Sequence, residues 1–122
     1  MTPPIEIKGL FFETEGGITL FEDVNLELRG GEKVAFIGPM SSGKIELFRI
    51  LSGVAKPKRG DVCLFGQAIG EISRRELDKL RERIGFISLN PNLISNLKVI
   101  ENVALPILYH TNIPRDDVIE KA

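Results

Sequence analysis

The stretch that decides how this chain folds is Gly38-Pro39-Met40-Ser41-Ser42-Gly43-Lys44-Ile45-Glu46. Its first seven positions match the P-loop pattern G-x-x-x-x-G-K-[ST], in which backbone amides and a lysine hold a phosphate chain. The eighth position should be a hydroxyl residue that helps to hold Mg²⁺, and here it is Ile45. The stretch therefore predicts a phosphate cradle that lacks one of its metal ligands.

The residues on either side of the loop have the pattern that a P-loop requires. The apolar run Lys33-Val34-Ala35-Phe36-Ile37 leads into Gly38 and predicts a buried parallel strand. After Lys44, apolar residues recur at helical spacing and predict a helix that ends near Ser52-Gly53. The amino terminus of that helix would add partial positive charge to the cradle. Residues 38–46 are therefore our predicted nucleotide-binding residues.

Composition excludes several classes of protein. The net charge of −1 gives no electrostatic support for binding nucleic acid. The basic residues between positions 74 and 83 alternate with acidic ones, which predicts a solvated helix face. No apolar run approaches the roughly 18 residues that span a bilayer, so we expect no direct membrane insertion. The first residues lack the pattern of a signal peptide, and the single Cys63 suits a reducing compartment.

Patterns elsewhere in the chain predict a mixed α/β arrangement. Alternating or short apolar runs between turn residues predict strands at positions 5–12, 18–28, 61–65 and 85–89. The capping box Ser73-Arg74-Arg75-Glu76 predicts a helix that reaches about Arg83. Two more helices are expected, one over residues 99–108 that bends at Pro106 and one that opens at Pro114. No catalytic triad, carboxylate pair or Cys/His metal cluster can be assembled from these residues.

The order of these pieces resembles the N-terminal portion of the ATP-binding subunit of ABC transporters. Residues 21–28 and 31–38 resemble that family's run into its P-loop, and Leu51-Ser52-Gly53 with Pro57, Gly60, Asp61 and Gly66 resembles the stretch after the P-loop helix. Residues 84–93 and 96–103 resemble the Q-loop strand and the start of the helical subdomain. Residues 104–111 resemble the branch that handles lipids, which includes the lipid-asymmetry and lipoprotein-release systems.

The resemblance implies an α/β fold: a P-loop NTPase (RecA-like) core, an antiparallel β-subdomain and the start of a helical subdomain, all incomplete. Residues 1–122 would be one partial nucleotide-binding domain, with residues 1–89 as β-subdomain and core and residues 90–122 as the start of the helical subdomain. The implied cofactors are ATP and Mg²⁺. The implied partners are a transporter membrane subunit, contacted through residues 90–105, and a second nucleotide-binding subunit or a second copy. The implied location is cytoplasmic, peripheral to the inner or plasma membrane through that partner.

The chain departs from the family pattern at the residues that hold metal and nucleotide. Ile45 and Glu46 replace the two hydroxyl residues, and Leu89 replaces the Q-loop glutamine. Thr14 stands where an aromatic residue commonly stacks on adenine, with Phe11 and Phe12 nearby as alternatives. The resemblance therefore implies weak ATP binding, and Ile45 places Mg²⁺ binding in doubt.

Glu46 leaves two alternatives open. A carboxylate facing the phosphates would meet like charge, and two such charges about 4 Å apart repel by roughly 4 kcal/mol at an effective dielectric near 20. Alternatively, Glu46 swings outward and favours the helix amino terminus. The first alternative predicts severe loss of ATP affinity and the second does not.

The expected function is that of an ATP-binding component of an ABC transporter, degenerate and truncated, with no ATP hydrolysis by this chain alone. The family's signature loop, catalytic glutamate and switch histidine would lie downstream of these residues. One alternative is a non-catalytic module that docks on a transporter membrane subunit. A minor alternative is another P-loop nucleotide enzyme, such as a small-molecule kinase.

Overall fold

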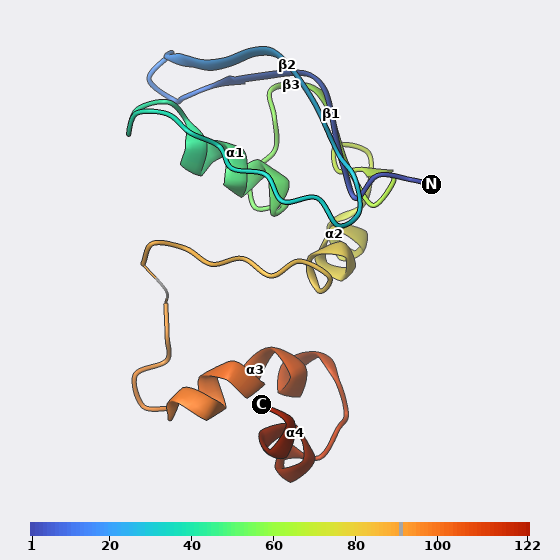
Figure 1. Cartoon of the computed structure of the whole chain (residues 1–122), viewed down its shortest axis with the longest axis vertical. Helices are drawn as coiled ribbons and strands as arrows, with labels where there is room; N and C mark the ends of the chain where they lie inside the picture. Colours follow the sequence, from blue (N-terminus) through green and yellow to red (C-terminus); the bar gives the residue numbers. More distant parts are fainter. Residues whose placement is uncertain (91) are drawn as a thin grey trace. The chain divides into compact units, whose positions relative to one another are not determined.

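A four-stranded antiparallel sheet is the main feature of the amino-terminal part of the computed structural model, which describes residues 1–90 and 92–122 (Figure 1). The strand order is β2-β1-β3-β4. The strands are β1 (Ile5–Glu13), β2 (Thr19–Leu28), β3 (Arg59–Leu64) and β4 (Gln67–Ala68). The predicted strands at 5–12, 18–28 and 61–65 are therefore confirmed, whereas the short β4 was not predicted.

A bulge in β1 explains how its alternating residues reach the core. Ile7 and Leu10 are both buried although three positions separate them, which strict alternation would not allow. The pairing register with β2 shifts between these two residues, and Gly9 between them has a φ of 59°. The Gly9 N–H donates to Asn25 Oδ1 at 2.8 Å. The bulge therefore turns Leu10 inward, and glycine permits the backbone conformation that it needs.

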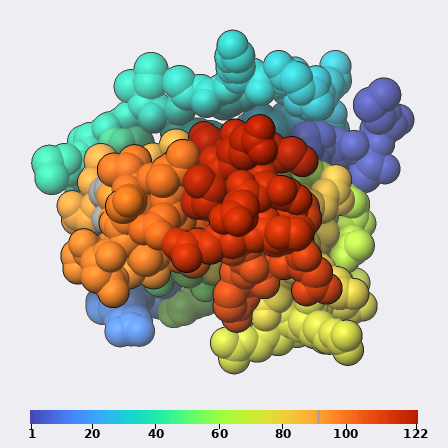
Figure 2. Space-filling model, turned by 90° about the horizontal axis from the view of Figure 1, so that it is seen from below, coloured from blue at the N-terminus to red at the C-terminus, as the bar shows by residue number. Residues whose placement is uncertain are grey.

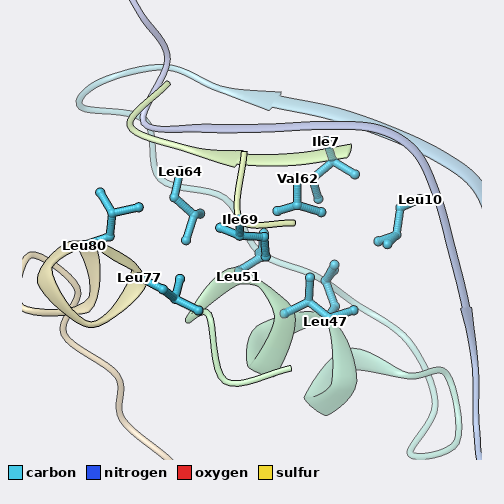
Figure 3. Packing of buried hydrophobic residues seen from close by; sticks show 10 residues of the cluster. Ile7, Leu10, Leu47, Leu51, Val62, Leu64, Ile69, Leu77 and Leu80 are labelled. Atoms are coloured by element: carbon cyan, nitrogen blue, oxygen red, sulfur yellow. The ribbon is translucent and has the colours of Figure 1, made fainter. Parts of the chain in front are cut away.

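The hydrophobic core lies between this sheet and two helices, α1 (Lys44–Leu51) and α2 (Arg74–Arg81) (Figure 3). The sheet contributes buried residues such as Val62 and Leu64, and α1 contributes Leu47 and Ile50. Leu77 of α2 closes the cluster at the other side. Because α1 directly follows the phosphate loop, its buried face fixes the loop to the rest of the core.

Local capping signals set the start of α2 and the end of α1 as predicted, and α2 ends at Arg81 rather than near Arg83. The Ser73 hydroxyl accepts from the Glu76 N–H at 3.3 Å, and the Ser73 N–H donates to the Glu76 carboxylate at 2.8 Å. This reciprocal pair begins α2. After α1, Gly53 adopts a φ of 70° and its N–H donates to the Ile50 carbonyl at 2.9 Å. A left-handed glycine is a common way to end a helix.

The chain divides into two units, Met1–Gly85 and Phe86–Ala122, and the second contains α3 (Val99–His110) and α4 (Arg115–Lys121). Figure 2 shows part of the surface of α3 and α4 in orange to red. Ala104 and Val118 are buried in this unit. The predicted helices at 99–108 and after Pro114 are confirmed, and α3 includes Pro106. No helix among the described residues is long and apolar enough to cross a bilayer.

Two predicted strands are not formed. The described residues place neither 33–37 nor 85–89 in the sheet, and both segments run without regular secondary structure. Ile37 is 96% exposed, so the prediction of a buried parallel strand before the loop was wrong for this chain. A parallel strand needs hydrogen-bonding neighbours on at least one side, and no described strand pairs with residues 33–37. Pro91, in the predicted turn after residue 89, lies outside the described residues.

Candidate nucleotide-binding site

The phosphate loop connects the segment at 33–37 to α1, and two glycines give it its shape. Gly43 has a φ of 87°, and a Cβ there would lie 2.9 Å from Phe21 Cζ and 3.2 Å from Leu20 Cβ. A Cβ at Gly38 would lie 2.8 Å from Ser42 Oγ. Gly43 therefore needs a residue without a side chain, whereas a side chain at Gly38 would displace the Ser42 hydroxyl. The sequence pattern identified these glycines, but it gave no sign that Leu20 and Phe21 of β2 support the loop from behind.

Lys44 is folded back over the loop that precedes it. Its ammonium donates to the carbonyl of Pro39 at 2.8 Å and also to the carbonyl of Gly38. The side chain is half-buried at the start of α1. The positive charge of Lys44 is therefore held at the mouth of the loop, within reach of a group that the loop would surround.

The first turn of α1 offers backbone donors to an anion. The Leu47 N–H donates to the Gly43 carbonyl at 2.9 Å, which is the first bond of the helix. The N–H groups of Lys44, Ile45 and Glu46 come before that bond and have no intrahelical acceptor. Gly43, the N-cap residue, makes no side-chain cap. Free donors and the positive end of the helix thus point toward the same region as Lys44, an arrangement suited to phosphate.

The side chains around the loop do not fit Mg²⁺. Ile45, at the position of the expected hydroxyl ligand, is 56% exposed and carries no oxygen. The Ser42 hydroxyl is buried and has no hydrogen-bond partner among the described residues. The described residues contain no group of three His, Cys, Asp or Glu side chains placed to hold a metal ion. The loop thus suits a phosphate chain better than a metal ion.

The other predicted nucleotide contacts have different roles in the structure. Thr14 closes the turn between β1 and β2, because its hydroxyl accepts from the Ile18 N–H at 3.1 Å. Phe12 packs against Phe21, with ring centroids 6.3 Å apart, and contacts the core. The Phe11 ring lies under the Arg59 guanidinium at 4.1 Å. Leu89 is 88% exposed in the second unit. Neither Phe11 nor Phe12 is therefore a free stacking surface for adenine.

Comparison with known proteins agrees with this geometry. Residues 21–122 match the family model described as ABC transporter. The chain is 33% identical over 112 residues to the intermembrane phospholipid transport system ATP-binding protein MlaF of Haemophilus influenzae, covering 92% of this chain and 42% of that protein. It is 34% identical over 100 residues to the lipoprotein-releasing system ATP-binding protein LolD of Chromohalobacter salexigens, covering 81% of this chain and 42% of that protein.

The fold is also similar to solved structures of the same kind. It superposes on the dimeric structure of MJ0796, described as a bacterial ABC transporter cassette, with a TM-score of 0.87 and 30% identity. That match covers 96% of this chain and 53% of the MJ0796 chain. The chain thus spans about half the length, or less, of these relatives. The predicted fold class, a P-loop NTPase core with an antiparallel β-subdomain, is confirmed, and the chain belongs to the ABC transporter family.

Proposed function

We propose that this chain is the N-terminal part of an ATP-binding subunit of an ABC transporter and binds the phosphate chain of ATP at residues 38–46. The observation that carries the proposal is the convergence of the Lys44 ammonium with the free N–H groups at the start of α1. The family match and the similarity to MJ0796, which has also been solved with bound ADP and Pi, support it.

Binding would use groups that are already in place. The N–H groups of the first turn of α1 would donate to phosphate oxygens, and the helix terminus would favour their negative charge. The Lys44 ammonium would leave the carbonyls of Gly38 and Pro39 for a phosphate oxygen, which is a stronger acceptor because it is charged. Glu46 opposes this, since its half-buried carboxylate lies in the same turn. Weak ATP binding is therefore the expected result.

The proposed partners follow from the relatives. MlaF and LolD are named for phospholipid transport and lipoprotein release, so we assign this chain to the lipid-handling branch and to a membrane subunit as partner. Other relatives are named for macrolide export and methionine import. Assignment to the lipid-handling branch is therefore a more specific proposal than the ATP-binding role. Residues 90–105 carry exposed apolar side chains at Leu93, Val99 and Val103, which suit such a contact. A second nucleotide-binding subunit and a cytoplasmic, membrane-peripheral location complete the proposal.

A second candidate function is a non-catalytic module that docks on a transporter membrane subunit. Ile45 and Leu89 favour it, because each stands where the family pattern needs a polar residue. The two candidates share the fold and the partner and differ in whether ATP binds. A different P-loop enzyme is not favoured, since the family match extends over residues 21–122.

ATP binding to the purified chain tests the proposal. Calorimetric titration should give a measurable affinity for the natural chain, and Lys44→Ala should weaken it at least about tenfold, because the only side-chain cation of the loop is lost. Lys56→Ala is the matched control, since Lys56 is exposed and outside the loop. Equal binding by the natural chain and the Lys44→Ala variant would reject residues 38–46 as the site. Absence of ATP binding, with retained binding to a transporter membrane subunit, would favour the docking module.

A further inference from the structure

The phosphate loop departs from the family pattern at the position that would bind Mg²⁺. Mg²⁺ takes about six oxygen ligands in near-octahedral geometry, commonly one or two from protein side chains and the rest from phosphates and water. In the P-loop pattern the protein ligand is the hydroxyl after the lysine. Ile45 stands there, with an exposed hydrocarbon side chain in the first turn of α1. The Ile45 side chain can exclude water from a nearby metal, but it has no atom that can bind the metal.

The hydroxyl of Ser42 does not replace the lost ligand. Ser42 Oγ is buried, and it lies so close to Gly38 that a Cβ there would be 2.8 Å away. A ligand for a metal on the open side of the loop must face that side, and this oxygen has no exposed surface. Ser41 is exposed, but it precedes Gly43 and the helix. Ser41→Ala therefore tests whether this hydroxyl serves as a metal ligand.

Glu46 changes the charge of the loop. It is the third residue of α1, is half-buried, and forms no ion pair or hydrogen bond with another described side chain. With Lys44 it brings the side-chain charge at the start of α1 to zero, where two hydroxyl residues would leave it at one positive charge. The carboxylate therefore weakens attraction for any phosphate chain, with or without a metal.

We propose that this loop binds the phosphate chain of a nucleotide without a protein-bound Mg²⁺, and that Ile45 and Glu46 are the residues that set this preference. The inference rests on the proposed function, because it concerns the same loop. The two residues act differently: Ile45 removes the metal ligand, and Glu46 lowers affinity by its charge.

Single variants separate these two effects. ATP is titrated into the full chain calorimetrically, once in excess EDTA and once in excess MgCl₂. The natural chain should give dissociation constants within about twofold of each other in the two buffers, because no protein group binds the metal. Ile45→Ser should bind at least about tenfold more tightly in MgCl₂ than in EDTA, since it restores the hydroxyl. Ile45→Ala is the matched control and should show no such difference.

Glu46→Gln tests the charge without changing the shape of the side chain. It should tighten ATP binding in both buffers, because the repulsion does not depend on a metal ligand. If Glu46 were itself a metal ligand, the natural chain would prefer MgCl₂ and Glu46→Gln would lose that preference. Ser41→Ala makes the same test for Ser41. Either result would overturn the inference and leave the proposed function standing.

The remaining outcomes also decide between the two proposals. Binding that appears only in Ile45→Ser and only with MgCl₂, with no detectable binding by the natural chain, would show that Ile45 removes the metal ligand but would overturn the proposal that the natural loop binds a nucleotide. Absence of ATP binding in the natural chain and in every variant, in both buffers, overturns the proposed function and this inference with it.

Discussion

Glu101 of α3 forms an ion pair with Arg115 of α4, and the same carboxylate accepts a hydrogen bond from the Lys98 N–H at 2.8 Å. One side chain thus caps the start of α3 and links it to the next helix. The backbone hydrogen bond and the charge of Arg115 both hold the pKa of Glu101 below its usual value of 4.5. The link between α3 and α4 is therefore sensitive to acid.

The first prediction concerns this acid sensitivity. A carboxylate whose pKa is lowered by folding stabilises the folded form above its unfolded pKa, and the stabilisation is lost as pH falls through the lowered value. We expect the protection factors of the α3 amides, which correct for the intrinsic slowing of exchange in acid, to fall in this acidic range. Glu101→Gln should show lower protection factors already at neutral pH and little further change on acidification. Exchange is followed by NMR between neutral pH and pH values below 4.5.

Glu76 provides the control, because the Ser73 hydroxyl and N–H lower its pKa in the same manner at the start of α2. Glu76→Gln should alter exchange in α2 and leave α3 unchanged. An acid response of α3 that is identical in the natural chain and in Glu101→Gln would contradict the assignment.

The second prediction concerns Gly60, where β3 meets the bulge of β1. Gly60 has a φ of 92°, and a Cβ there would lie 2.3 Å from the Gly9 carbonyl oxygen. Gly17 has a φ of 78° but open space around it. Gly17→Ala should therefore lose only about 1–2 kcal/mol of unfolding free energy, which is the cost of a left-handed conformation for a residue with a Cβ. Gly60→Ala should lose clearly more, since backbone must move, and urea unfolding measures both. Equal losses would show that the sheet yields without strain at Gly60.

The third prediction is that the purified chain does not hydrolyse ATP. Hydrolysis needs a positioned base or metal at the phosphates, and Ile45 and Leu89 supply neither. The described residues also hold no group of three His, Cys, Asp or Glu side chains placed to bind a metal ion. Phosphate release should equal that of Lys44→Ala at every ATP concentration tested. Phosphate release by the natural chain above that of Lys44→Ala would show that the described residues contain a catalytic group that we have not identified.

Local signals in the sequence predicted most of the helices and the loop. The Ser73–Glu76 pair, Gly53 after α1 and Pro114 before α4 act within a few residues, so their outcome is independent of distant parts of the chain. The phosphate loop is of the same kind, because Gly38 and Gly43 determine its backbone locally.

Features that depend on distant residues were less predictable. An apolar run at 33–37 indicates that a strand can form, but hydrogen-bonding neighbours decide whether it does, and none is present among the described strands. The two-residue β4 follows a turn in which Phe65 and Gly66 both have positive φ, and no alternation reveals so short a strand. The contact of Phe21 with the loop likewise depends on how β2 lies in the folded sheet.

The fourth prediction is that the chain self-associates through residues 33–37. This segment has no ladder partner among the described strands, and Val34 and Ile37 are both exposed. Unpaired backbone with apolar side chains is a template for pairing with another chain. We expect sedimentation velocity to show species that grow with concentration, and Ile37→Lys to shift them toward monomer, because a lysine on an edge opposes pairing. Ile18→Lys is the matched control: it makes the same change at a residue that is 64% exposed in the turn between β1 and β2, so it should not alter the association. A strictly monomeric chain with a sharp, concentration-independent thermal transition would show that residues 33–37 are satisfied without a partner.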